Sequence, residues 1–179
     1  MKKIILFISV LTFAVSSEIK NKSIEIIKSY YNQEILVSEN LFLISKNVKN
    51  NIQNQVKQRF YRDQIYYWAI DIKGETQYAL LDNTIGKTMP ITFLVLFNEK
   101  EEVIHSAIVK YRESYGGEIS GTRWMSQFIG MKRDSLFKFE SEIDGITGAT
   151  ISVKSFTKGI SKLSLLLPYI IQYHKKLKK

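Results

Sequence analysis

After its leading apolar run, the first third of the chain spaces its hydrophobic residues as a helix does. Between residues 41 and 60, apolar side chains recur every three or four positions, with mostly Asn, Gln and Lys between them. This spacing places the apolar residues on one helix face. They are Leu41, Ile44, Val48, Ile52, Val56 and Phe60. We therefore expect a helical amino-terminal segment over residues 18–62, which packs on the protein's own sheet or on a partner.

The middle of the chain has the shorter period of β-strands. Aromatic and β-branched residues separated by polar turns predict strands at 65–72, 76–81, 91–97 and 103–111. Residues 91–97 are almost all apolar, which is typical of a strand that is buried on both faces. Because short turns connect most of these segments, we expect an antiparallel meander.

The last third of the chain returns to a helical period. A compact turn of small residues at 144–150 precedes a long helix, which Pro168 is expected to kink or end. Its apolar face consists of Val153, Phe156, Ile160, Leu163, Leu166 and Ile170. Before the turn, residues 122–129 predict one or two helical turns and residues 136–139 a short strand. The predicted fold class is α+β: an antiparallel sheet packed with amino-terminal and carboxy-terminal helices.

The first seventeen residues have the layout of a secretory signal peptide. Two lysines precede a 12-residue apolar run at 4–15, and serines follow at 16 and 17. The run is shorter than the about 20 residues that span a bilayer. An uncleaved anchor or a buried helix is the alternative interpretation. We expect the mature protein to be exported and soluble in the periplasm or cell envelope, without a transmembrane span.

These patterns divide the chain into three parts: a signal peptide at 1–17, the helical segment at 18–62 and a carboxy-terminal domain at 63–179. The absence of cysteine excludes disulfides, thiolate nucleophiles and cysteine-ligated zinc or iron–sulfur centres. With only two histidines, a histidine-built metal site is not expected. The formal charge is +9, but the lysines are scattered and not interleaved with stacking aromatics, so nucleic-acid binding is not predicted.

The candidate chemical site is the turn at 144–150. Its glycines clear side-chain bulk from the backbone, Thr147 and Thr150 carry hydroxyls, and a helix N-terminus with unpaired N–H groups follows. Such a place binds phosphate, or one of the threonines simply caps the helix. A P-loop is excluded because no Lys-Ser or Lys-Thr follows the glycine. The residues alone leave phosphate binding and capping both open.

The sequence of this turn, Asp-Gly-Ile-Thr-Gly-Ala-Thr, closely resembles the flavinylation motif of the FMN-binding domain family. That family includes FMN-carrying subunits of the sodium-pumping NADH:quinone reductase and of the related Rnf complex. The resemblance implies that Thr150 accepts FMN through a phosphoester bond, which a flavin transferase makes with FAD as the donor. It also implies that Thr147, Gly148 and Ala149 form the recognition turn and that Asp144 is the upstream acid.

Other segments resemble the family in the same order along the chain. Residues 81–92 resemble its entry into the central strand, 111–118 its Glu-then-Gly loop, and 124–130 its Trp…Gln-Phe…Gly segment. The resemblance covers about 76–165, or half the chain. The pump subunits usually carry Pro before a Gly in the Glu loop, whereas Tyr115 precedes the glycines here, which is more similar to small stand-alone members.

The resemblance implies further contacts to the cofactor. Glu113 hydrogen-bonds flavin edge or ribityl groups, Gly116 and Gly117 let the backbone approach the flavin, and Trp124 stacks on its ring. The plain alternatives are a surface carboxylate, a strand-end turn and a core aromatic. For Lys87 the choice is between contact with the phosphate and simple solvation.

The leading hypothesis is an exported flavoprotein that carries FMN covalently and relays electrons between membrane or envelope redox proteins. On this hypothesis the protein acts as an electron-transfer carrier instead of a stand-alone enzyme. The alternatives are a flavin reductase with non-covalent FMN and a cofactor-free envelope binding module. Flavin retained after denaturation, flavin released by denaturant, and colourless protein distinguish the three.

Overall fold

The computed structural model describes the backbone of residues 2–114, 116–138 and 143–178, and the side chains of 17–114, 116–135 and 143–178. The chain forms two compact units, Met1–Glu34 and Ile35–Lys179. The first unit contains helix α1, Lys2–Tyr31, which runs through the predicted signal peptide and on past it. Where side chains are described, no helix has both the length and the apolar character needed to cross a membrane.

The second unit is built on a five-stranded sheet, in which each strand pairs antiparallel with the next along the chain. The strands are β1 (Leu36–Leu43), β2 (Gln64–Ile72), β3 (Glu75–Ile85), β4 (Pro90–Phe97) and β5 (Val103–Lys110). The predicted meander and the α+β class, with an antiparallel sheet and helices near both ends of the chain, are confirmed. Strand β4 is buried from Ile91 to Phe97 and thus on both faces, as its apolar run predicts.

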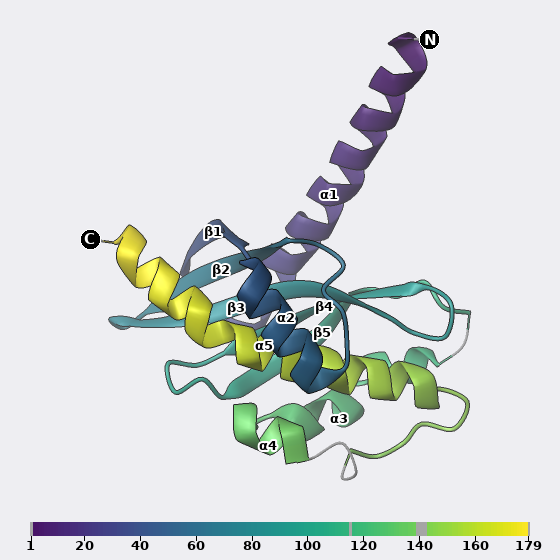
Figure 1. Cartoon of the computed structure of the whole chain (residues 1–179). Helices are drawn as coiled ribbons and strands as arrows, with labels where there is room; N and C mark the ends of the chain where they lie inside the picture. The colour runs from purple at the N-terminus through teal and green to yellow at the C-terminus, as the bar shows by residue number, and fades with distance from the viewer. Residues whose placement is uncertain (1, 115, 139–142, 179) are drawn as a thin grey trace. The chain divides into compact units, whose positions relative to one another are not determined.

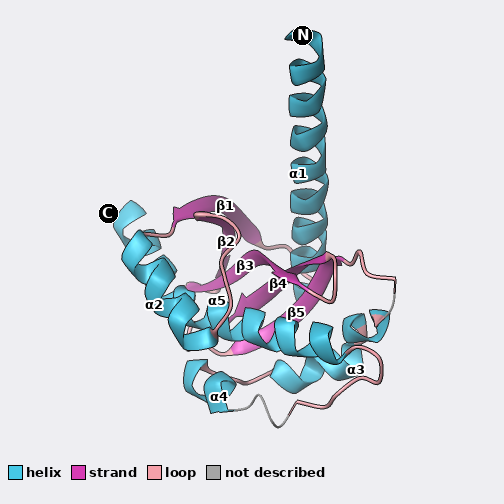
Figure 2. Cartoon of the chain, turned by 45° about the vertical axis from the view of Figure 1, so that its right-hand side comes forward, coloured by secondary structure: helices cyan, strands magenta, loops and turns pink. Residues whose placement is uncertain are grey.

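Helices cover one face of this sheet, as Figures 1 and 2 show. The long helix α5 contacts β3 and β4, α2 lies beside it, and the short helices and turns follow β5. Their bounds are α2 (Lys46–Val56), η1 (Gly117–Ser120), α3 (Thr122–Met125), η2 (Ser126–Phe128), α4 (Arg133–Lys138) and α5 (Thr150–Leu177). The predicted apolar face of α5 is confirmed, since all six of its residues are buried.

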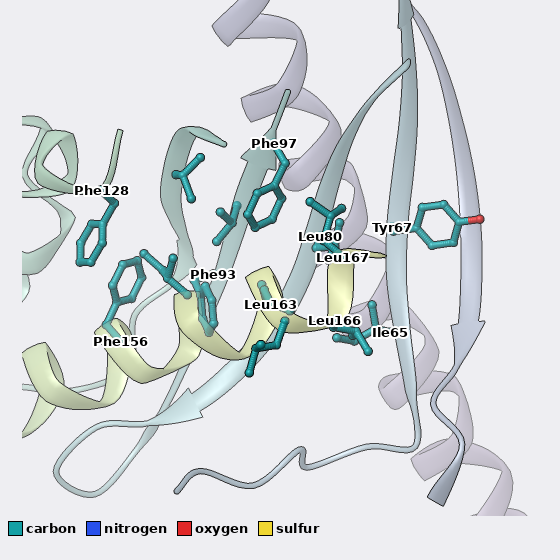
Figure 3. Close-up of a cluster of buried hydrophobic side chains, with 14 of the residues drawn as sticks. Ile65, Tyr67, Leu80, Phe93, Phe97, Phe128, Phe156, Leu163, Leu166 and Leu167 are labelled. Carbon is teal, nitrogen blue, oxygen red and sulfur yellow. The ribbon is translucent and has the colours of Figure 1, made fainter. Parts of the chain in front are cut away.

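The core between α5 and the sheet is rich in aromatic rings. Phe156 of α5 packs against Phe93 of β4 with ring centroids 5.1 Å apart, and Phe128 lies 5.6 Å from Phe156 (Figure 3). Leu163 and Leu166 continue this contact along the helix. This packing fixes the axis of α5 over the sheet, and therefore fixes where the N-terminus of α5 lies.

The structure differs from the predicted elements at two places, and at a third it excludes one of two predicted alternatives. Residues 18–62 are not one helical segment: between α1 and α2 the chain forms β1, which pairs with β2 from Leu36 opposite Asp71 to Leu43 opposite Gln64. Residues 133–138 are helix α4 where a strand was expected to begin at 136; position 139 lies outside the described residues. Helix α5 does not end at Pro168 but continues to Leu177.

Candidate functional site

The candidate site begins at the turn that leads into α5. The Ala149 N–H donates to the Ile146 carbonyl at 2.9 Å, which closes a four-residue turn. Gly148 occupies its third position with φ of +80°, a backbone conformation that type II turns require there and that glycine adopts without strain. Thr147 and Thr150 on either side are exposed to solvent, and Thr150 is the first residue of α5.

The N-terminus of α5 has no side-chain cap. Its N-cap residue is Ala149, which has no side-chain acceptor, and no described side chain makes a capping hydrogen bond there. The sequence left open whether Thr147 or Thr150 caps the helix, and in the structure neither side chain does so. The first N–H groups of the helix and the positive end of its dipole remain available to an anion.

The loop after β5 lies directly against this turn. Gly116 has φ of +78°, and a Cβ atom built on it would lie 2.7 Å from the Ala149 Cβ and 3.0 Å from the Tyr111 hydroxyl. Only glycine allows these two backbone segments to approach so closely. Ala149 is 4% exposed as a result, so the residue next to Thr150 is held in place by the opposite loop.

Glu113 fixes the loop between β3 and β4. Its Oε1 accepts the backbone N–H groups of Thr88 at 2.7 Å and Met89 at 3.0 Å, and its Oε2 accepts the Thr88 hydroxyl at 3.0 Å. The hydrogen bonds from the Met89 and Thr88 backbone lower the pKa of the Glu113 carboxyl, because they favour the charged form. The carboxylate thus has protein partners of its own at the edge of the site.

These three segments enclose one cavity of about 670 Å³. The β3–β4 loop, the loop after β5 and the start of α5 each provide part of its wall. Its lining residues are Lys87, Thr88, Glu113, Ser114, Gly116, Glu118, Thr147, Gly148, Ala149, Thr150, Ile151 and Ser152. An exposed threonine hydroxyl, an uncapped helix N-terminus and a lysine therefore share one hollow.

Trp124 lies in the core next to the site and does not line the cavity. It is 8% exposed and packs edge-on against Phe128. Its indole N–H donates to the Asp144 carbonyl at 2.7 Å, and the Gln127 Oε1 accepts the Asp144 N–H at 2.9 Å. Gln127 in turn donates to the Trp124 carbonyl at 3.0 Å. The two side chains hold both peptide groups of Asp144, where the motif begins.

The structure brings six of the nine predicted site residues together on the cavity wall. They are Glu113, Gly116, Thr147, Gly148, Ala149 and Thr150. Asp144, Gly117 and Trp124 do not line it. Five of the wall residues were not expected from the sequence: Thr88, Ser114, Glu118, Ile151 and Ser152. The only signal for them was their position next to predicted residues or near them in the same loops.

Residues 86–164 match the sequence model of a family described as the FMN-binding domain. The chain carries an FMN-binding domain. Every residue on the cavity wall falls within the matched range, whereas β1, α2, β2 and β3 precede it. Searches among curated proteins and among solved structures each found no match to the chain.

The cavity fits the cofactor of an FMN-binding domain in size and chemistry. Its volume of about 670 Å³ lies within the range of roughly 300–1,000 Å³ that is usual for small-molecule sites. The uncapped N-terminus of α5 suits a phosphate. Gly116 and Ala149 pack against each other at this wall, so the only side-chain atom that the two residues place there is one methyl group.

Proposed function

We propose that the FMN-binding domain holds FMN through a phosphoester bond to the Thr150 hydroxyl and that the protein relays electrons between redox partners. The observation that supports this most is the position of Thr150. It is exposed, it starts α5 at an uncapped helix end, and it lies on the wall of a cavity large enough for a flavin.

Attachment on this proposal needs an external enzyme. The Thr150 Oγ1 forms a bond to the FMN phosphorus of FAD, the pyrophosphate bond breaks, AMP leaves, and the hydroxyl proton passes to a base. A threonine hydroxyl is a weak nucleophile without such a base. The described cavity wall contains no histidine, and Glu113 already accepts three hydrogen bonds. A flavin transferase therefore supplies the base, and this chain presents the hydroxyl.

The other wall residues bind and orient the group. The first N–H groups of α5 bind the phosphate, and the Lys87 side chain on the opposite wall adds positive charge. The close fit of Gly116 against Ala149 fixes the turn relative to the opposite loop. When bound, FMN supplies reversible one- or two-electron transfer, and the surrounding protein tunes its potential.

The proposal includes export to the periplasm or cell envelope by the signal peptide at residues 1–17. There, a covalent bond has a clear advantage, because it prevents loss of the cofactor by dissociation. The proposed partners are the flavin transferase and membrane or envelope redox proteins.

The test is co-expression of the chain with a flavin transferase, followed by intact-mass measurement and in-gel flavin fluorescence after denaturation. We expect one added mass equal to FMN minus water. Thr150→Ala should abolish it and Thr150→Ser should retain it. Thr122→Ala is the matched control, because Thr122 is also exposed at the first residue of a helix. Unmodified wild-type protein, or a full label on Thr150→Ala, would contradict the proposal; flavin released by denaturant would favour non-covalent binding.

A further inference from the structure

A second hollow lies further along the first turns of α5. It has a volume of about 580 Å³ and lies between the end of α2, the end of β3 and α5. Four cationic side chains line it: Lys57, Arg59, Lys154 and Lys158. We call it the basic groove.

The basic groove has one sign of charge. None of the described residues on its wall is an aspartate or glutamate. Lys57, Arg59 and Lys154 are exposed, and the ion pairs found among the described residues do not include them. Like charges at close range raise the potential inside a concave surface, so the groove attracts anionic groups.

The floor of the groove is held by hydrogen bonds. The Gln58 Nε2 donates to the Thr84 hydroxyl at 2.7 Å and to the Ser155 carbonyl at 2.8 Å. This one amide therefore connects the end of α2 to β3 and α5. The Lys162 ammonium donates to the carbonyl of the groove residue Arg59 at 2.9 Å and forms a buried ion pair with Asp82 at 2.8 Å. The fold thus fixes the segments under the groove, and the exposed cationic side chains complete its wall.

The groove adjoins the proposed flavin site. Ile151 lines both hollows and is 52% exposed between them. Along α5, Lys154 and Lys158 follow Thr150 by one and two helical turns, or about 6 and 12 Å along the axis. A molecule bound in the groove is therefore held within one or two turns of the attachment point.

We propose that the basic groove docks an acidic segment of the protein that exchanges electrons with this one. The inference rests on the proposed function for the redox role of that partner. A protein segment fits better than a membrane, because the cationic surface is concave and a bilayer surface is flat. It fits better than single-stranded nucleic acid, because the groove has one aromatic residue, Tyr61, and nucleic-acid grooves stack successive bases on several.

The test uses a fluorescent deca-glutamate peptide as the probe and measures its anisotropy on the full chain, without FMN, at low and high salt. Lys154→Glu combined with Lys158→Glu should weaken binding about tenfold at low salt, since each reversal replaces an attraction with a repulsion. The matched control is Lys175→Glu with Lys176→Glu, which makes the same change in net charge on exposed lysines near the other end of α5. It should change binding by less than about twofold.

Equal weakening by both double variants would overturn the proposal, because it would show an effect of net charge alone. Anionic phosphatidylglycerol vesicles or oligo-dT that bind more tightly than the peptide, and lose binding through the groove variant, would also overturn it. A urea unfolding midpoint close to that of the wild-type chain confirms that the variant is folded.

Flavin attachment is measured separately on the same variants. The groove variant should be labelled as fully as the wild-type chain, since its two lysines do not line the cavity. Loss of label would assign the groove to the transferase and overturn docking of a redox partner. If the wild-type chain itself takes no flavin while the peptide still binds through the groove, the proposed function fails and the docking surface for an acidic segment stands.

Discussion

Gly116→Ala is the substitution that most directly tests how the site is assembled. The new methyl group would lie 2.7 Å from the Ala149 Cβ, and the backbone would have to keep φ of +78°. Both effects act on the residue next to Thr150. We therefore expect the substitution to reduce stability and to lower flavin attachment.

The magnitude follows from two contributions. A non-glycine residue in the left-handed region costs about 1–2 kcal/mol. An extra methyl group forced into a close contact typically costs about 1–3 kcal/mol. The free energy of unfolding should therefore fall by about 2–5 kcal/mol, a large share of the about 5–15 kcal/mol that stabilises an ordinary domain.

Gly117→Ala is the matched control for this change. A Cβ atom on Gly117 meets nothing within 4 Å, and its backbone does not have positive φ. The control should shift stability by about 0.5 kcal/mol or less. Urea unfolding of all variants, followed by circular dichroism, gives the comparison, and intact mass after co-expression with the transferase gives the extent of attachment.

A double-mutant cycle separates the two contributions. Combining Gly116→Ala with Ala149→Gly removes the Cβ that the new methyl group would contact, but leaves the strained φ. The double variant should recover about 1–3 kcal/mol relative to the sum of the single variants. If Gly116→Ala behaves like Gly117→Ala, or if the cycle shows no coupling, the close approach of the two loops does not organise the site.

Two further predictions concern the residues that hold the loops. Trp124→Phe should lower the free energy of unfolding by about 1–3 kcal/mol beyond the loss of ring area, and should lower flavin attachment, because the Asp144 carbonyl loses its donor. Trp68→Phe is the comparison, since the buried Trp68 indole N–H has no partner among the described residues. In urea unfolding, its cost beyond the loss of ring area should be smaller. The lowered pKa of Glu113 stabilises the fold above pH about 4.5, and this contribution is lost as the pH falls through the folded value. Glu113→Gln should therefore lessen the decline in unfolding midpoint below pH 4.5.

The sequence predicted the elements whose pattern is local and strong. The apolar run of β4 and the apolar face of α5 are both buried, and in each case the spacing of apolar residues alone indicates which side chains are buried. The turn into α5 was also predicted, because its small glycine and threonine residues directly precede a long helical period. The periods of these elements gave the α+β class, and the sequence of the turn indicated the family whose model matches residues 86–164.

Strand β1 shows where local pattern was insufficient. Leu41 and Ile44 have helical spacing, but residues 36–43 lie at the sheet edge, are mostly exposed, and are held as a strand by their pairing with β2. Hydrogen bonds to a segment more than 20 residues away outweigh local preference here. Nothing in the spacing of residues 36–43 alone contains that information.

The relations between distant segments were decided by the tertiary structure. Trp124 was expected to stack on the flavin or to pack in the core, and the fold places it in the core, where it holds the Asp144 backbone. The contact of Gly116 with Ala149 joins segments more than 30 residues apart, and the basic groove joins segments about 100 apart. Sequence period reports burial along one element, whereas these contacts depend on how α5 crosses the sheet, which packing of the whole core determines.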